Sequence, residues 1–289
     1  TSTRIGGGIS TDGGAVTIND TLLVDGALVI DTEQGDNSAA GSVTVTGAID
    51  GANGNTDTLT VNTVSGGGTN GAVDFQGAYG TNVVTGSALV AGALDVDGAQ
   101  IDVQTVQVDN GNIELTGSNI DLNGTTYQTT SSGAITFTGP VDLFANVVAT
   151  TSGGSAATFT AAVSGNAGTE TLEVNTSAGA GTADFQAGAD VTNVGSLTVN
   201  AGAGNVNLRS ATGVDGSIVV TGGDGAVGSG PAINLYGNLT STAASITPLI
   251  DINGEVELQA AVTVTGPGGA GDDIDFSAEI DGAEDLTVD

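Results

Sequence analysis

Residues 196–208 read Ser-Leu-Thr-Val-Asn-Ala-Gly-Ala-Gly-Asn-Val-Asn-Leu. Two short runs, 197–199 and 206–208, alternate aliphatic with polar residues, and a glycine-rich corner separates them. Alternation with a period of two puts the aliphatic side chains on one face of a strand and the polar side chains on the other. The stretch therefore predicts two short strands joined by a tight corner.

The same pattern extends along the whole chain, and no helical periodicity interrupts it. Comparable alternating runs occur at 15–18, 42–46, 59–62, 94–97, 113–115, 120–122, 172–174, 256–258, 262–264 and 274–276. Val, Ile and Thr dominate these runs, and branching at Cβ suits a pleated surface. Asn-Gly and Asp-Gly pairs between the runs supply the backbone freedom that tight corners need. The sequence predicts an all-β protein.

The composition excludes several classes of function. Among 289 residues there is no Cys or His, and Arg4 and Arg209 are the two basic residues against 33 Asp and Glu, for a formal net charge of −31. Thiolate and imidazole metal sites, Ser–His or Cys–His catalysis and lysine Schiff bases therefore cannot form. Nucleic acid is not an expected partner because a polyanion would be repelled. No apolar run is long enough for a membrane-spanning helix.

Related passages recur at intervals of roughly 115 to 120 residues. Gly-Ala-Val-Thr-Ile at 14–18 returns as Gly-Ala-Ile-Thr-Phe at 133–137 and, more loosely, as Gly-Glu-Val-Glu-Leu at 254–258. We therefore expect one continuous domain over residues 1–289 with about two and a half internal repeats, at 14–132, 133–253 and 254–289. The longest departures from the pattern are expected at 100–110 and 211–230.

Two architectures fit this pattern: a parallel β-solenoid, which stacks short strands turn on turn, and tandem β-sandwich domains of about 100 residues. A sandwich core normally centres on large aromatic residues, whereas this chain has no Trp, six Phe and three Tyr. The narrow interior of a solenoid can be filled by Val, Ile, Leu, Ala and Thr. The solenoid, with turns of about 25 residues, is the favoured prediction.

Three passages carry a resemblance to a known group: Gly-Ala-Ile-Thr-Phe-Thr-Gly at 133–139, Ser-Leu-Thr-Val-Asn-Ala-Gly at 196–202 and Glu-Ile-Asp-Gly-Ala-Glu-Asp-Leu-Thr-Val-Asp at 279–289. They resemble the β-strand-repeat proteins of bacterial surfaces, which are related to filamentous haemagglutinin-type adhesins. The resemblance implies a right-handed parallel β-helix, a secreted or cell-surface location, and a role in adhesion, matrix or filament building. It brings no catalytic motif with it.

Carboxylates provide the candidate ligands for an ion. Asp95 and Asp97 are two residues apart on one expected strand, so both should point to the same face. Asp272, Asp273, Asp275 and Asp281 belong to the densest acidic stretch. Oxygen ligands at this density suit Ca²⁺, the candidate cofactor. The competing interpretation is a solvated acidic face that keeps a secreted fibre soluble.

Other side chains give weaker hypotheses. Paired carboxylates can hydrolyse glycosides, but cleavage of an acidic polysaccharide needs cationic anchors, and Arg209 is the one interior candidate. We expect Arg209 to pair with a neighbouring carboxylate and the chain not to be an enzyme. Tyr79, Tyr127 and Tyr236 could stack on sugars, but single tyrosines of this kind usually pack in a core or a corner.

The expected function is therefore that of an extracellular structural protein, a subunit or segment of a secreted filament, sheath or surface layer. The alternative is an adhesin that binds a host surface or a polysaccharide. Neither 1–10 nor 283–289 resembles a cap, so we expect both ends to stack on further turns. Self-association into an oligomer or polymer is expected, and carboxylate repulsion requires acid-free contact strips or bridging divalent cations.

Overall fold

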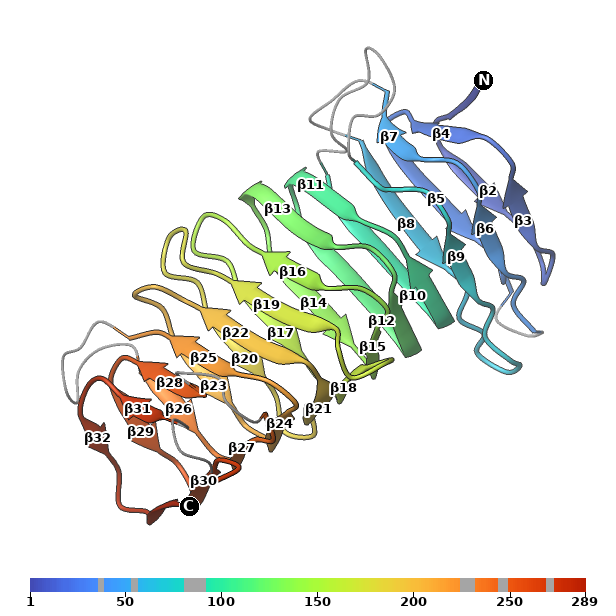
Figure 1. Cartoon of the computed structure of the whole chain (residues 1–289). Helices are drawn as coiled ribbons and strands as arrows, with labels where there is room; N and C mark the ends of the chain where they lie inside the picture. Colours follow the sequence, from blue (N-terminus) through green and yellow to red (C-terminus); the bar gives the residue numbers. More distant parts are fainter. Residues whose placement is uncertain (36–38, 53–56, 81–91, 224–231, 244–248, 269–272) are drawn as a thin grey trace. The chain divides into compact units, whose positions relative to one another are not determined.

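The computed structural model describes residues 1–35, 39–52, 57–80, 92–223, 232–243, 249–268 and 273–289 (Figure 1). Every regular element in these ranges is a β-strand. The chain divides into two compact units, Thr1–Gly139 and Pro140–Asp289, which together contain about ten turns of parallel β-solenoid. The predicted solenoid is confirmed. The tandem-sandwich alternative is wrong, because each strand pairs in parallel with strands of neighbouring turns.

The N-terminal unit has three parallel sheets, and the chain passes through them in the same order in successive turns, with β10 and β12 each extending through two of them. The first sheet contains β1 (Ser2–Ile5), β4 (Thr21–Val24), β7 (Ile49–Gly51), β11 (Val106–Asn110) and β13 (Thr126–Ser132), with Tyr79 bridging β7 and β11. The second contains β2 (Gly8–Ser10), β5 (Ala27–Asp31), β8 (Thr58–Asn62), β10 (Leu94–Val103), β12 (Ile113–Leu122) and β14 (Ile135–Thr138). The third contains β3 (Val16–Ile18), β6 (Val43–Val45), β9 (Val73–Phe75) and the second halves of β10 and β12.

The C-terminal unit repeats this plan. Its first sheet contains β16 (Val147–Thr150), β19 (Thr171–Asn175), β22 (Ser196–Asn200), β25 (Ile218–Thr221), β28 (Ile250–Asn253) and β31 (Ile274–Phe276). The second contains β17 (Ala157–Phe159), β20 (Ala183–Phe185), β23 (Val206–Leu208), β26 (Ile233–Leu235), β29 (Val256–Leu258) and β32 (Ile280–Asp281). The third contains β15 (Val141–Leu143), β18 (Val163–Gly165), β21 (Val191–Val194), β24 (Thr212–Val214), β27 (Leu239–Ser241), β30 (Val262–Thr265) and β33 (Leu286–Val288).

Aliphatic side chains of successive turns stack inside the coil. Leu172, Leu197, Ile218 and Ile250 pair residue on residue across four strands of one sheet, and each is at most 1% exposed. The polar residues between them face outward, as the alternation predicted. Burial of apolar area, at about 25 cal/mol per Å², is the main source of stability in such a column.

Aromatic residues also enter the interior. Phe159 and Phe185 lie in register on β17 and β20, and their rings stack with centroids 4.9 Å apart and an interplanar angle of 6°. Tyr127 and Phe137 meet edge to face at 6.1 Å. The interior therefore accommodates aromatic rings in pairs, either between successive turns, as with Phe159 and Phe185, or within one turn, as with Tyr127 and Phe137.

The corners bring backbones of adjacent turns into contact. A Cβ added to Gly133 would lie 1.8 Å from the carbonyl oxygen of Gly111, and Gly133 also has a positive φ of 126°. Buried threonines satisfy corner carbonyls: the hydroxyl of Thr63 donates to Gly71 O at 2.8 Å, and that of Thr176 donates to Gly181 O at 2.9 Å. These positions require glycine and threonine for reasons of space and hydrogen bonding.

The predicted sequence repeats do not return to the same sheet. The passage at 14–18 contains β3 of a third sheet, whereas the passages at 133–137 and 254–258 contain residues of β14 and β29, which belong to second sheets. The structural unit is one turn, and side-chain contacts between successive turns often link residues 25 apart. Repeat length and turn length are therefore separate periodicities in this chain.

One predicted excursion is wrong. Residues 100–110 belong largely to β10 and β11, because in-register pairing with β12 and β13 holds them in extended conformation. The other expected excursion, 211–230, contains β24 and β25, and its residues 224–230 lie outside the described residues. No helix that could span a membrane is found in the described ranges.

Replacing Phe185 by Ala tests the packed interior. The change removes a ring that is 1% exposed and its stacking contact with Phe159. We therefore expect the free energy of unfolding to fall by about 3–5 kcal/mol. Phe144→Ala is the matched control, because Phe144 is 44% exposed and its loss should change stability by about 0.5 kcal/mol or less. Urea denaturation followed by circular dichroism measures both, and equal effects would contradict the packing described.

Candidate functional site

A row of carboxylates follows the third sheet of the N-terminal unit. Asp102 on β10 lies in register between Asp74 on β9 and Asp121 on β12. All three side chains alternate with buried apolar residues and therefore face outward. Neighbouring strands are about 4.8 Å apart, so the three charges are close together.

The central carboxyl of this row has an altered affinity for protons. Partial burial, a hydrogen bond to Asp121 and repulsion from Asp121 and Asp74 raise the pKa of Asp102 to about 6, although a hydrogen bond from Gln100 acts in the opposite direction. Asn119 donates to an oxygen of Asp121 at 2.7 Å and to Gln100 Oε1 at 3.2 Å. The row can therefore hold a proton between carboxylates in mildly acidic solution, stabilised by neighbouring amides.

Asp95 and Asp97 lie on the outer face of β10, as the alternation predicted. Asp95 is in register with Glu114 on β12 and Thr60 on β8. Partial burial, followed by the charges of Asp97 and Glu114, raises the pKa of Asp95. The structure brings these three carboxylates together on one sheet.

The remaining predicted ligands are spread over the last turn. Asp275 on β31 lies opposite Asp251 on β28, in the first sheet. Asp281 on β32 lies opposite Glu257 on β29, in the second sheet, and its carboxylate accepts a hydrogen bond from the Gly282 N–H at 2.7 Å. These side chains belong to different sheets rather than to one cluster.

Asp273 is exposed just before β31, and Asp272 lies outside the described residues. Within the described ranges, no group of three or more Asp or Glu side chains is arranged to hold a metal ion. The predicted Ca²⁺ ligands thus remain a prediction.

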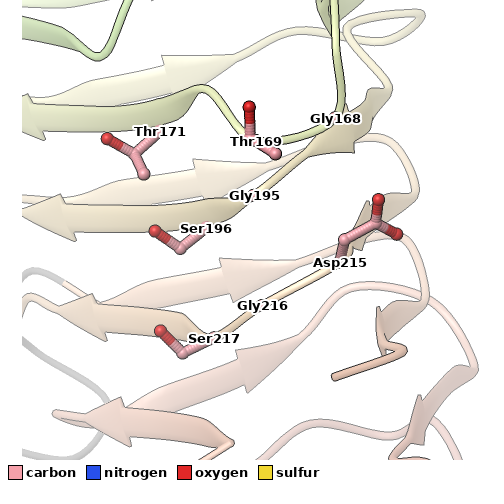
Figure 2. A pocket seen from close by; sticks show the side chains of 8 residues that line it. All are labelled: Gly168, Thr169, Thr171, Gly195, Ser196, Asp215, Gly216 and Ser217. Atoms are coloured by element: carbon pink, nitrogen blue, oxygen red, sulfur yellow. The ribbon is translucent and has the colours of Figure 1, made fainter. Parts of the chain in front are cut away.

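The C-terminal unit has a shallow groove of about 470 Å³ where its third sheet turns into its first (Figure 2). The lining residues are small or polar and come from three consecutive turns: Gly168, Thr169, Thr171, Gly195, Ser196, Asp215, Gly216 and Ser217. Figure 2 shows the side chains of Thr171, Ser196 and Ser217 one below another, where β19 and β22 begin and just before β25. The register continues this row, because Thr171 pairs with Ser196 and the next residues, Leu197 and Ile218, also pair.

Unequal corner lengths and glycine create this groove. Only Gly195 separates β21 from β22, and residues 215–217 separate β24 from β25, whereas residues 166–170 form a longer corner in the preceding turn. A Cβ on Gly216 would lie 1.9 Å from Gly195 O, and a Cβ on Gly195 would lie 2.7 Å from Thr169 O. The floor of the groove is therefore formed by the backbones of adjacent turns in direct contact, and no side chain of Gly195 or Gly216 fills the space above it.

Two carboxylates fix the shape of the groove. The Glu170 carboxylate accepts hydrogen bonds from the backbone N–H groups of Ala167 at 2.9 Å and Thr169 at 3.2 Å, and these bonds lower the pKa of Glu170. Thr242 donates its hydroxyl to Asp215 Oδ1 at 3.0 Å. Hydrogen bonds within the protein thus hold both the corner at 166–170 and the side chain of Asp215 in place.

Sequence reasoning did not identify the groove. A signal was present, because Gly-Ser followed by an aliphatic-x-Val run occurs at 195–199 and again at 216–220. This repeated pattern indicates a groove only when it is compared with the longer corner, residues 166–170, of the preceding turn. The arrangement offers hydroxyl groups and one carboxylate to a polar ligand.

The other candidate side chains have structural roles. Arg209 donates from Nε to Asp184 Oδ1 at 2.9 Å, as predicted, and its guanidinium carbon lies 5.2 Å from the ring centroid of Tyr236. Tyr79 and Tyr127 are at most 1% exposed. These two tyrosines pack in the core, so they are not available to stack on a sugar.

Comparison with protein-family models, with curated proteins and with solved structures gives no match.

The carboxylate row predicts an unusual pH dependence. The pKa of Asp102 is higher in the folded chain than its ordinary 3.8, so its ionisation destabilises the folded state above about pH 6, and the penalty is relieved as the pH falls toward 4. Asp102→Asn should therefore stabilise the chain at pH 8, by about 1 kcal/mol because solvent screens partly exposed charges. The gain should vanish near pH 4.

Asp109→Asn is the control of opposite sign. Hydroxyls of Thr130 and Ser131 donate to the Asp109 carboxylate and lower its pKa. This group stabilises the fold at neutral pH and loses that effect as the pH falls through its folded-state pKa. Asp109→Asn should destabilise at pH 8, with a smaller effect in acid. Urea midpoints of both variants from pH 2 to 8 check this, because the Asp109 effect is lost only below its ordinary pKa of 3.8. Identical pH profiles of the two variants would contradict the prediction.

Proposed function

We propose that this chain is a non-enzymatic structural segment of an extracellular filament, sheath or surface layer. The observation that carries the proposal is the turn-on-turn register within each unit, in which Leu172, Leu197, Ile218, Ile250 and Ile274 follow one another along one sheet. Each turn contacts mainly its neighbours, so such a coil gives stiffness and can be lengthened by adding turns.

The resemblance to β-strand-repeat proteins of bacterial surfaces supports the proposed secreted or cell-surface location. A net charge of −31 is consistent with this location, because a strongly charged surface keeps an exposed fibre soluble. The chain needs no disulfides, since in-register ladders and a packed interior stabilise each unit.

Self-association of such chains must overcome carboxylate repulsion. Outward carboxylates stand opposite one another on adjacent strands, for example Asp251 with Asp275 and Glu257 with Asp281. We propose that Ca²⁺ bridges carboxylates of two chains, because Ca²⁺ takes six to eight oxygen ligands. The absence of a three-carboxylate metal site within the described ranges fits a site that needs two chains.

The second candidate function is an adhesin that binds a polysaccharide. The groove at Thr171, Ser196 and Ser217 favours it, because a purely structural coil has no need of a preformed hollow. Neither candidate is an enzyme. The described lining offers one carboxylate, Asp215, whereas most glycoside hydrolases use two.

Chelation tests the structural proposal. Purified chain in Ca²⁺ should sediment as large particles that appear as filaments or sheets by electron microscopy. EDTA should disperse them while the β-sheet circular dichroism signal survives, because the coil is stabilised by apolar burial and backbone ladders. Particles that resist EDTA would contradict ion bridging, and a chain that stays monomeric in Ca²⁺ would contradict the structural proposal.

A variant pair locates the bridging residues. Asp275→Asn with Asp281→Asn should raise the Ca²⁺ concentration needed for assembly. Asp109→Asn is the control, since Thr130 and Ser131 already occupy the Asp109 carboxylate, and it should assemble as the unmodified chain does. Equal behaviour of the two would exclude Asp275 and Asp281 as bridging ligands.

A further inference from the structure

We propose, resting on the second candidate function given above, that the groove of the C-terminal unit binds a neutral polysaccharide chain. Its volume of about 470 Å³ falls within the usual range of about 300–1,000 Å³ for small-ligand sites. The lining extends over three turns of the coil, so a linear ligand can lie along it and contact each turn in succession.

The hydroxyl row supplies the recognition chemistry. Thr171 and Ser196 begin β19 and β22, and Ser217 directly precedes β25, so the three residues lie on successive turns spaced by about 4.8 Å. Each hydroxyl donates one hydrogen bond and accepts up to two. A sugar polymer presents hydroxyls at a regular short repeat along its length. Several of them can therefore form hydrogen bonds with the protein hydroxyls at the same time.

Asp215 adds a stronger acceptor to this row. Its carboxylate is oriented by the Thr242 hydroxyl at 3.0 Å, and its remaining lone pairs can accept hydrogen bonds from two neighbouring sugar hydroxyls. Because Glu170 and Thr242 already fix the groove, binding requires little ordering of the protein.

Charge selects a neutral ligand. The described lining contains Asp215 and no basic residue, and the whole chain has a net charge of −31. Sulfated, phosphorylated or carboxylated polymers would be repelled. A neutral glycan meets no such repulsion, and its binding should be insensitive to salt.

The backbone of the groove argues against a peptide strand as the ligand. Gly195 N donates to Glu170 O at 2.7 Å, Leu197 N donates to Ser217 O at 2.9 Å, and Thr171 N donates to Asn146 Oδ1 at 3.1 Å. An added strand needs free backbone groups, and these three are occupied. The lining hydroxyls and the Asp215 carboxylate are therefore the groups we assign to ligand binding.

Affinity electrophoresis of the full chain tests the proposal and detects weak binding. Native gels contain hydroxyethyl cellulose, dextran or galactomannan as neutral probes, with alginate as the anionic comparison. We expect retardation by at least one neutral polymer, equal at low and high salt, and none by alginate. No retardation by any neutral polymer would overturn the proposal, as would retardation by alginate alone.

Paired variants tie binding to the groove. Ser196→Ala with Ser217→Ala removes two hydroxyls and should weaken binding about tenfold or more, the effect of losing two hydrogen bonds. Ser2→Ala with Ser10→Ala removes two exposed hydroxyls of the N-terminal unit and should leave binding unchanged. Equal losses in both pairs would overturn the assignment.

Asp215→Asn provides a second test that does not depend on the serine variants folding. The amide keeps the shape of the side chain but weakens acceptance of hydrogen bonds, so binding of the neutral polymer should fall several-fold with salt independence retained. Unchanged binding by this variant would place the ligand elsewhere and overturn the proposal. Circular dichroism of each variant checks that the fold is intact.

Discussion

The parallel, in-register pairing of successive turns is the interaction on which each unit depends. It satisfies backbone N–H and C=O groups along three sheets and places like residues on top of one another, as with Leu172, Leu197 and Ile218. Those residues are at most 1% exposed, and each is in register with its counterpart in the neighbouring turn. Backbone pairing and apolar burial are therefore coupled, and a slip of one residue would turn the aliphatic side chains outward.

The corners differ in length from turn to turn, whereas the strands of each sheet keep the same alternating pattern. Strands must keep their alternation, but the segment between two strands can be a single residue such as Gly195 or a longer loop such as 166–170. Short corners beside long ones leave a hollow on the surface, and glycine lets the turns approach there. A coil with a strictly repeated interior can thus acquire a binding site without disturbing its core.

The strands and the solenoid could be predicted from the sequence. The alternation at 197–199 predicts a strand, and these residues lie in β22. The small number of aromatic residues argued against a sandwich core. Sequence reasoning failed where the answer depends on the neighbouring turn. Residues 100–110 look like a loop but are held as strands by β12 and β13. The carboxylate row at Asp102 and the groove at Ser196 depend on register between turns of unequal length, which no local pattern reveals.

Disulfide trapping tests the central claim of turn-on-turn register most directly, because the chain has no native Cys. Glu173 and Thr198 are register partners on β19 and β22, and Val219 follows on β25. Partners about 4.8 Å apart fall within disulfide range, whereas residues two turns apart do not. Glu173→Cys with Thr198→Cys should oxidise readily to an internal disulfide, and Glu173→Cys with Val219→Cys should not. Efficient trapping of the second pair, or failure of the first, would contradict the register and the structure built on it.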